Sequence, residues 1–468
     1  MKIEQIYTGC LAHGAYYIES NGEAVVIDPL REVTPYLKKA EADKAVIKYV
    51  FETHFHADFV SGHLDLAEKT GAKIVYGPGA QPKFPAIIGV DGEQFRVGGV
   101  SFELLHTPGH TMESCCFLLK DESGKPVALF SGDTLFIGDV GRPDLAQKAA
   151  NKTKEELAAI LYHSLRTKIL PLPDHLVVYP AHGAGSACGK NMARETTDTL
   201  GHQKATNYAL RASMTENEFV QEVTEGLTTP PGYFPHNVKM NKEGYDSLDL
   251  VMKRGKTAFT PDAFEAAANE TGALLLDTRD AQVFAKGFVP NSINIGIDGN
   301  FAPWVGALIP DIQQPLLLIT DEGREEEVIT RLARVGYDHT IGFLDGGFSS
   351  WQSAGKETDH ILSVAPSTVA GLLHHSDVEV LDVRRPDEYR LVHVENAINI
   401  PLDEINKEIA SLSRDKRYIV HCAGGYRSMI FLSILRARGF EHLTDVRGGF
   451  KAIREDGRFS LTTGEPAC

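Results

Sequence analysis

Two groups of residues in this 468-residue chain have the types and spacing that catalysis needs. His54 and His56 alternate along an extended stretch that ends at Asp58, so both imidazoles point the same way and can approach one cation. Far downstream, Cys422 begins a glycine-rich loop that leads to Arg427. The chain therefore offers a candidate metal site and a candidate nucleophilic thiol.

Three short motifs in the first half of the chain add further ligand-type side chains. His110 lies in the stretch TPGHT, Asp133 in SGDT and His182 in PAHG. Each motif follows a strand pattern or lies in a turn, and loops at one edge of a sheet can converge. We therefore expect these side chains to surround one site, although ordinary hydrogen bonding in the core or at the surface is the alternative.

The order HxHxD, TPGHT, SGDT and PAHG, over about residues 1–210, resembles the metallo-β-lactamase superfamily. The resemblance implies an αββα sandwich, in which two mixed sheets are covered by outer helices. Asp28, in the stretch Ile-Asp-Pro, is expected to support the ligands rather than to be one.

Phe59 stands where the usual HxHxDH motif of this superfamily has its last histidine. Two-metal hydrolases need that histidine for the second cation, so its absence favours a single metal ion. Two histidines and one carboxylate with open positions opposite suit non-haem Fe(II) and O₂. The persulfide dioxygenases of the superfamily use the matching ligands, which implies one Fe(II) per chain on His54, His110 and Asp133.

The same resemblance gives roles to four other side chains. His56, Asp58 and His182 would orient the ligands or handle protons, and His56 could also bind the cation directly. Arg142 matches an arginine that faces the thiol substrate, so it would hold a substrate carboxylate. An ordinary loop ion pair between Arg142 and Asp144 is the alternative.

The loop after Cys422 predicts a sulfur-binding cradle. Gly424 and Gly425 allow successive backbone N–H groups to point inward ahead of a helix, which stabilises thiolate or persulfide sulfur. Arg427 would attract an anionic sulfur compound, or else form an ion pair at the helix N-terminus. The loop resembles the rhodanese domain over about residues 365–460, and its C-x4-R spacing is shorter than the C-x5-R of cysteine phosphatases.

An internal repeat includes this loop. The stretch LDTR at residues 276–279 matches LDVR at residues 381–384, an offset of 105. Each copy alternates strand and helix patterns, which predicts a parallel sheet covered by helices on both faces. In the first copy Asp321 is expected opposite Cys422, so this rhodanese-like domain would be catalytically silent and serve as a spacer or docking surface.

The elements that must position these residues follow the same alternation in the first part of the chain. Helical patterns run over residues 150–163 and 191–211, and a proline-rich, irregular connector covers about residues 214–257. We predict an α/β multidomain protein with domains at residues 1–257, 258–360 and 361–468.

The composition restricts the partners. A net charge of −16, without a cluster of basic residues, argues against nucleic acid and anionic membranes. No apolar run approaches the roughly 20 residues that span a bilayer. The six cysteines lack disulfide spacing, which suits a reducing, cytoplasmic compartment. Among them, Cys188 is either a sulfur acceptor or a buried thiol without a role.

The two sites together resemble the persulfide dioxygenase–rhodanese fusion proteins of bacterial sulfide detoxification, in the branch with an extra degenerate rhodanese domain. The resemblance implies oxidation of a glutathione, coenzyme A or bacillithiol persulfide by O₂ to sulfite, and transfer of sulfur through Cys422 to give thiosulfate. A homo-oligomer is expected. The alternatives are a glyoxalase II-type zinc thioester hydrolase with an attached sulfurtransferase, against which Phe59 argues, and a non-enzymatic sulfur carrier or redox sensor.

Overall fold

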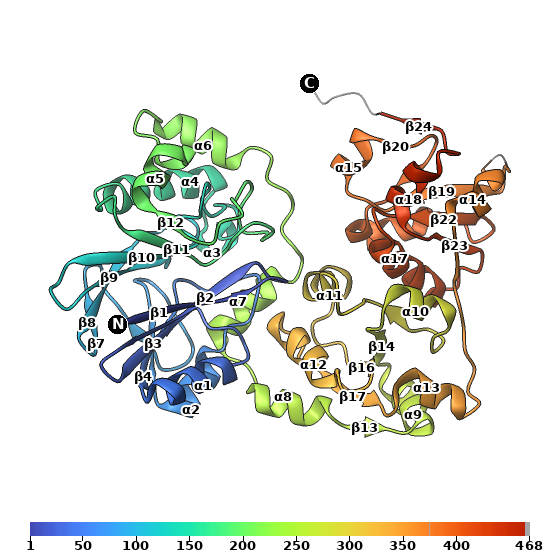
Figure 1. The fold of residues 1–468 in the computed structure, drawn as a ribbon, viewed down its shortest axis with the longest axis horizontal. Coiled ribbons are helices and arrows are strands. Elements are labelled where there is room, and N and C mark those ends of the chain that lie inside the picture. Colours follow the sequence, from blue (N-terminus) through green and yellow to red (C-terminus); the bar gives the residue numbers. More distant parts are fainter. Residues whose placement is uncertain (374, 464–468) are drawn as a thin grey trace. The chain divides into compact units, whose positions relative to one another are not determined.

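The computed structural model describes residues 1–373 and 375–463 (Figure 1). The chain separates into two compact units, Met1–Leu248 with Ala333–Gly336, and Asp249–Leu332 with the chain from Tyr337 onward. The predicted metal motifs lie in the first unit, and both copies of the repeat lie in the second apart from Ala333–Gly336 of the first copy. No helix within the described residues is long and apolar enough to cross a membrane.

Two six-stranded sheets form the first unit. The first sheet has the order β1 (Lys2–Thr8), β2 (His13–Ser20), β3 (Glu23–Ile27), β4 (Val46–Phe51), β5 (Lys73–Tyr76) and β6 (Ile87–Ile88). The second has the order β12 (Asp198–Thr199), β11 (Val177–Pro180), β10 (Pro126–Gly132), β9 (Cys115–Lys120), β8 (Val100–His106) and β7 (Gln94–Val97). The helices of this unit are α1 (Thr34–Asp43), α2 (His63–Thr70), α3 (Gln147–Ala150), α4 (Lys154–Ser164), α5 (Leu200–Thr206), α6 (Glu216–Thr224) and α7 (Phe234–Glu243).

Strand β2 shows why the sheets pack as layers. Successive side chains of a strand point to opposite faces. Tyr16 and Ile18 pack with Phe117 of β9 in the core between the sheets, whereas Ala15 and Tyr17 pack in a separate cluster with residues of α1 and α2. Residues of α4, α5 and α6 cover the outer face of the second sheet in a third cluster. The expected αββα sandwich is confirmed.

The helix expected over residues 191–211 is wrong for its first half, because only α5 (Leu200–Thr206) and a short 3₁₀ turn form. The carboxylate of Asp139 accepts hydrogen bonds of 2.7 Å from the backbone N–H groups of Lys190 and Asn191. These bonds hold the start of the segment before α5 in a loop, and they take the place of hydrogen bonds within a helix.

The connector expected over residues 214–257 is largely helical. It contains α6, α7 and α8 (Leu248–Gly255). Pro235 lies in the first turn of α7, where the missing N–H costs nothing because that position has no partner within a helix. The proline-rich stretch therefore precedes a helix and opens it.

The second unit holds two five-stranded sheets in which every strand pair is parallel. The first has the order β13 (Ala258–Phe259), β17 (Thr340–Leu344), β16 (Leu316–Ile319), β14 (Leu274–Asp277) and β15 (Ile293–Asn294). The second has the order β18 (Leu362–Val364), β23 (Leu443–Val446), β22 (Arg417–His421), β19 (Val378–Asp382) and β21 (Ile398–Asn399). All four residues of β16 are buried, so both faces of the sheet are covered, as predicted.

Helices separate the parallel strands of each copy. The first copy contains α9 (Pro261–Thr271), α10 (Ala281–Lys286), α11 (Phe301–Leu308), α12 (Glu325–Arg334) and α13 (Gly347–Ser353). The second contains α14 (Pro366–Val369), α15 (Pro386–Leu391), α16 (Ile405–Glu408), α17 (Tyr426–Ala437) and α18 (Gly449–Asp456), and β20 (His393–Val394) pairs with β24 (Leu461–Thr462). The domain boundaries expected at residues 257 and 360 stay predictions.

The repeat is visible in its hydrogen bonds. Arg279 donates from Nε to Asp277 Oδ1 at 3.0 Å, and Arg384 donates from Nε to Asp382 Oδ1 at 2.9 Å. The two guanidinium groups stack on equivalent phenylalanine rings, those of Phe348 and Phe450. We call this arrangement the Asp–Arg pair, and its presence in both copies confirms that the two copies have the same fold.

Candidate functional site

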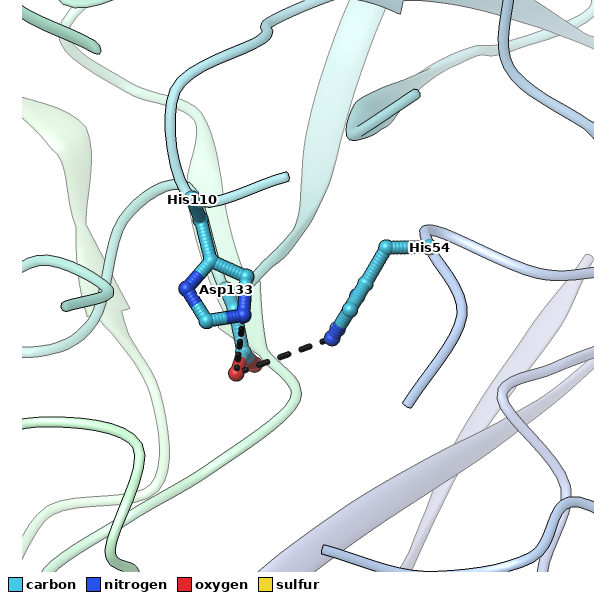
Figure 2. A group of neighbouring side chains, drawn as sticks. All are labelled: His54, His110 and Asp133. Atoms are coloured by element: carbon cyan, nitrogen blue, oxygen red, sulfur yellow. Dashed lines mark ion pairs between the residues drawn. The ribbon is translucent and has the colours of Figure 1, made fainter. Parts of the chain in front are cut away.

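His54, His110 and Asp133 meet at the ends of three strands of the first unit. Asp133 Oδ2 lies 3.8 Å from Nε2 of His54 and 3.5 Å from Nε2 of His110, and Figure 2 shows both imidazoles directed at this carboxylate. One ligand atom from each residue lies within 4.8 Å of the others. Neither carboxylate oxygen of this buried aspartate has a hydrogen-bond partner in the described chain. Two imidazole nitrogens and an unpaired carboxylate fit a metal cation.

Each imidazole is held through its other nitrogen. Nδ1 of His110 lies 2.8 Å from the carbonyl oxygen of Arg142, and Nδ1 of His54 lies 3.0 Å from Thr53 Oγ1. The Thr53 hydroxyl in turn donates to Asp28 Oδ2 at 2.9 Å, so it accepts from His54. Both Nε2 atoms are thereby left free for a cation. Asp28 acts through Thr53, a residue that the sequence reasoning missed.

Burial fixes the charge of these groups. It lowers the pKa of His54 well below its ordinary value, with help from neighbouring imidazoles, and lowers the pKa of His110 to about 4. Both rings are then neutral near pH 7, which is the form that binds metal. Burial and the nearby Asp58 raise the pKa of Asp133 well above its ordinary value. A bound cation would offset that effect and favour the carboxylate.

His182 and Asp58 lie beside this triad. His182 Nε2 is 3.4 Å from Asp58 Oδ2 and 3.6 Å from Asp133 Oδ1. Ligand atoms of His56, Asp58 and His182 also lie within 4.8 Å of one another. The structure therefore brings together all six side chains that the sequence predicted for this site.

His56 is turned toward buried carboxylates. Its Nε2 lies 3.0 Å from Asp28 Oδ1 and 3.4 Å from Glu52 Oε2. Burial alone would lower the pKa of His56, but these two carboxylates outweigh burial and raise it well above its ordinary value. The nearness of two carboxylates favours a supporting role for His56, and both this role and direct binding of the cation stay predictions. Sequence reasoning missed Glu52.

Arg142 is engaged within its own unit. Its guanidinium forms a two-point ion pair with Asp144, at 2.7 and 2.8 Å, and donates to the carbonyl oxygens of Ala187 and Thr228. The loop ion pair that the sequence left as the alternative is thus present. Binding of a substrate carboxylate by Arg142 stays a prediction, and it would require exchange of these bonds.

Cys188 lies at the same site. Its sulfur belongs to a group with ligand atoms of Asp133 and His182, all within 4.8 Å of one another. The side chain is buried, and burial raises the pKa of its thiol well above the ordinary value. The thiol form therefore prevails near pH 7 in the protein without metal.

The Cys422 loop lies between β22 and α17. The backbone N–H of Gly425 donates to Cys422 Sγ at 3.1 Å, and a φ of 107° at this position favours glycine. Phe450 N–H, in the first turn of α18, donates to the carbonyl oxygen of Cys422 at 2.6 Å. One backbone N–H beside a helix N-terminus is thus bonded to the sulfur, whereas a cradle of successive N–H groups that includes Gly424 stays a prediction.

Arg427 is paired with a carboxylate beside the Cys422 loop. It forms a two-point ion pair with Glu388, at 2.6 and 2.9 Å, so its charge is compensated. A cavity of about 450 Å³ borders the loop and carries three basic side chains; its lining is Arg384, Ala423, Phe450, Lys451, Arg454 and Glu455. Attraction of a sulfur anion by Arg427 stays a prediction, and this cavity is a second place for one.

Strand register corrects the comparison of the two copies. Asp277 of the first copy pairs with Ile319, and the equivalent Asp382 pairs with His421. The next residues, Thr320 and Cys422, are therefore equivalent, and the sequence alignment that placed Asp321 opposite Cys422 was wrong by one residue. The first copy still has no thiol at this position.

Comparison with known proteins follows the same division. A model of the metallo-beta-lactamase superfamily matches residues 8–182, and a rhodanese-like domain model matches residues 260–354 and 365–456. A crystal structure of a metallo-beta-lactamase from Staphylococcus aureus is 32% identical, covers 73% of this chain and 98% of its own, and superposes with a TM-score of 0.64. The chain belongs to the metallo-β-lactamase superfamily. Two rhodanese-like domains follow its metallo-β-lactamase domain.

Curated relatives of the metallo-β-lactamase domain have two different activities. A probable hydroxyacylglutathione hydrolase of Schizosaccharomyces pombe is 32% identical over 38% of this chain and 66% of its own length. The mitochondrial persulfide dioxygenase of Homo sapiens is 35% identical over 34% of this chain and 59% of its own. The chain spans 57% to 66% of the length of these and similar relatives.

Phe59 lies beside His56 in the metallo-β-lactamase domain. Its buried ring lies 4.2 Å from the ring of His13 and 4.4 Å from that of His56, centroid to centroid. We expect Phe59→His to add an imidazole ligand beside Asp58 and His182, and to raise bound metal from about one to about two ions per chain. Elemental analysis after loading with excess metal and desalting measures this ratio. Phe59→Leu, which adds no ligand, is the control, and an unchanged ratio in Phe59→His contradicts the prediction.

Asn241 of α7 supports the loop that carries His56. Its amide nitrogen donates to the carbonyl oxygens of His56 and Phe59, at 2.9 and 2.8 Å, and its amide oxygen accepts from Ser61 N–H at 2.8 Å. Local sequence patterns could not reveal a contact with a partner 185 residues away.

We expect Asn241→Ala to destabilise this loop by about 2–4 kcal/mol, because it leaves several buried backbone groups unpaired. Hydrogen exchange of the amides in residues 56–61 should accelerate more than about tenfold. Asn237→Ala is a matched control one turn earlier in α7, since the Asn237 amide is buried without a hydrogen-bond partner among the described residues. Equal exchange in both variants would refute the supporting role.

Proposed function

We propose that this protein oxidises low-molecular-weight thiol persulfides with O₂ to sulfite, and that it converts sulfite to thiosulfate in cytoplasmic sulfide detoxification. The observation that carries the proposal is the triad of His54, His110 and Asp133, together with Phe59, which lies beside His56 at the position where the superfamily motif has a further histidine. A cysteine cradle in the same chain adds the sulfur-transfer step. We propose one Fe(II) per chain and a homo-oligomer.

The two reactions balance as follows. A persulfide RSSH, O₂ and water give RSH, HSO₃⁻ and H⁺. Cys422 thiolate then takes the outer sulfur of a second RSSH and releases RSH. Sulfite attacks that outer sulfur, which leaves as thiosulfate and restores the Cys422 thiolate. The carrier thiol is glutathione, coenzyme A or bacillithiol.

His54, His110 and Asp133 would hold the iron in the oxidation step. When bound there, Fe(II) supplies the activation of O₂, which side chains cannot provide. Thr53 and the carbonyl oxygen of Arg142 keep Nε2 of the two imidazoles directed inward. Burial lowers the pKa of His182 to about 3. In neutral form it can accept a hydrogen bond at the site, and Asp58, 3.4 Å from its Nε2, positions it.

The chain's residues also support the transfer step. Gly425 N–H stabilises negative charge on the sulfur of Cys422. The bordering cavity offers Lys451 and Arg454 to an anionic sulfite or carrier. The Asp–Arg pair holds Arg384 beneath Phe450, so this arginine shapes the cavity wall.

A zinc thioester hydrolase of the glyoxalase II type is the second candidate. The hydroxyacylglutathione hydrolases among the relatives are 32% to 36% identical, as close as the persulfide dioxygenases. The group of His56, Asp58 and His182 could take part in binding a second cation. Phe59, which lies beside His56 at the motif position of the missing histidine, argues against that arrangement.

One experiment separates the two candidates. Fe(II)-loaded protein, prepared without oxygen, is supplied with glutathione, coenzyme A or bacillithiol persulfide while O₂, sulfite and thiosulfate are followed. Zinc-loaded protein is supplied with S-lactoylglutathione in parallel. Rapid O₂ uptake with thiosulfate as the product supports the dioxygenase. Hydrolysis of the thioester by the zinc form, without O₂ uptake by the iron form, would replace it with the hydrolase.

A further inference from the structure

Helix α17, which begins at the Cys422 loop, is bonded along one face to the first rhodanese-like domain. Tyr426 in its first turn donates from its hydroxyl to the carbonyl oxygen of Gly296 at 2.7 Å. Ser433 accepts from the backbone N–H of Asn294 at 2.9 Å. Arg436 forms a two-point ion pair with Asp359, at 2.7 and 3.0 Å. The helix that supports the thiol is therefore fixed by its neighbour over its whole length.

The ring of Tyr426 occupies a space that two glycines leave open. A Cβ at Gly299 would lie 2.3–2.8 Å from atoms of the ring, and a Cβ at Gly296 would lie 3.3 Å from it. Neither glycine has the positive φ that requires this residue type. They are needed here for space alone.

The glycines belong only to the first copy of the repeat. At the offset of 105, their counterparts in the second copy are Pro401 and Glu404. A module that served merely as a spacer would have no use for a cavity shaped to a side chain of the other module. The loop of the first copy carries Thr320 in place of a thiol. The space for Tyr426 therefore does not serve a sulfur-transfer reaction at the loop of the first copy.

Tyr426 is linked directly to the reactive sulfur. It follows Gly425, whose N–H donates to Cys422 Sγ at 3.1 Å. A second set of hydrogen bonds links the first turn of α17 to the first domain. The buried Asp445 accepts from Ser428 Oγ at 2.8 Å and from Gln282 Nε2 of the first domain at 3.3 Å. Displacement of the tyrosine ring would move the peptide that bonds the sulfur.

We propose that the first rhodanese-like domain positions the Cys422 cradle, with Tyr426 as the positioning residue and Gly296 and Gly299 as its binding site. The proposal rests on the role of Cys422 in the proposed function, but its test needs no turnover. A domain without a thiol thus acts on the reaction by holding one backbone N–H against the sulfur of the other domain.

The test measures alkylation of Cys422 by iodoacetamide against pH in the full chain, with the modified peptide quantified by mass spectrometry. In Gly299→Ala the added methyl group displaces the ring and weakens the hydrogen bond to sulfur. We expect the midpoint of the rate profile to rise by about one pH unit, so that alkylation near neutral pH is about tenfold slower. Tyr426→Leu should shift the midpoint similarly.

Three further variants make the outcome specific. Gly299→Ala combined with Tyr426→Leu should shift the midpoint no more than Tyr426→Leu alone, because the clash has been removed. Tyr426→Phe keeps the ring and should shift it less. Leu317→Val weakens the core of the first domain away from Tyr426, and should lower thermal stability while leaving the midpoint unchanged.

A Gly299→Ala profile that coincides with wild type would overturn the proposal, as would an equal shift in Leu317→Val. Either result leaves the role of Cys422 intact if Cys422→Ser still loses thiosulfate formation. Conversely, a Cys422→Ser chain that keeps forming thiosulfate sinks the transfer function, while the positioning of the loop can still be read from the alkylation profile.

Discussion

Asp133→Ala is expected to abolish tight iron binding and to reduce persulfide-dependent O₂ uptake by more than about 100-fold. Loss of a partner behind a metal ligand already costs about 10- to 100-fold, and Asp133 is the carboxylate of the triad itself. Without it the site keeps two neutral imidazoles and no compensating charge. Iron content per chain and the initial rate of O₂ uptake measure the effect.

Asp174→Ala is the control for this variant, since it removes an aspartate whose side chain is 73% exposed in the same unit. Iron content and O₂ uptake should both match wild type there. If Asp133→Ala bound iron and consumed O₂ like the control, the triad would not be the metal site. Alkylation of Cys422 should be unaffected by Asp133→Ala, because the two sites lie in separate units.

Cys422→Ser is expected to reduce thiosulfate formation by more than about 10³-fold while O₂ uptake continues and sulfite accumulates. A serine hydroxyl is a poor nucleophile at neutral pH and cannot carry a sulfane sulfur as a persulfide does. Gly425 N–H would then face an uncharged hydroxyl in place of sulfur. Product analysis by chromatography after persulfide oxidation separates sulfite from thiosulfate.

Cys10→Ser is the control for the thiol, because Cys10 is a partly exposed free cysteine outside both sites. It should form thiosulfate at the wild-type rate. Thiosulfate from Cys422→Ser at the wild-type rate would show that sulfite takes up sulfur elsewhere, and Cys188, beside Asp133 and His182, would be the next thiol to replace.

Local motifs predicted the triad and the cysteine loop because each motif follows a strand directly, and the end of that strand positions its side chains. The resemblance to persulfide dioxygenases selected His54, His110 and Asp133, and their ligand atoms lie within 4.8 Å of one another. The supporting groups could not be predicted in this way. Asn241 lies in a helix expected to be an irregular connector, and it reaches His56 across 185 residues.

Two of the three errors in the element and register predictions have the same origin. The segment before α5 has a helical pattern. Its first backbone N–H groups, however, donate to the carboxylate of Asp139, which lies in a loop 51 and 52 residues earlier. Likewise, the alignment that chose Asp321 followed apolar residues along one strand, whereas the register is set by the neighbouring strand through Asp277 and Ile319. Tertiary hydrogen bonds decided both cases, and they leave no local pattern.

The Asp–Arg pair has a consequence for how such chains are assigned functions from genomes. It is kept in a copy whose loop carries Thr320 as well as in the copy that carries Cys422. Its presence in both copies therefore indicates a shared fold, and it does not by itself show that a copy carries a reactive thiol. A sequence profile weighted on that pair would detect the rhodanese-like fold. A profile weighted on the residue that follows β16 or β22 would distinguish copies that carry the thiol from copies that lack it.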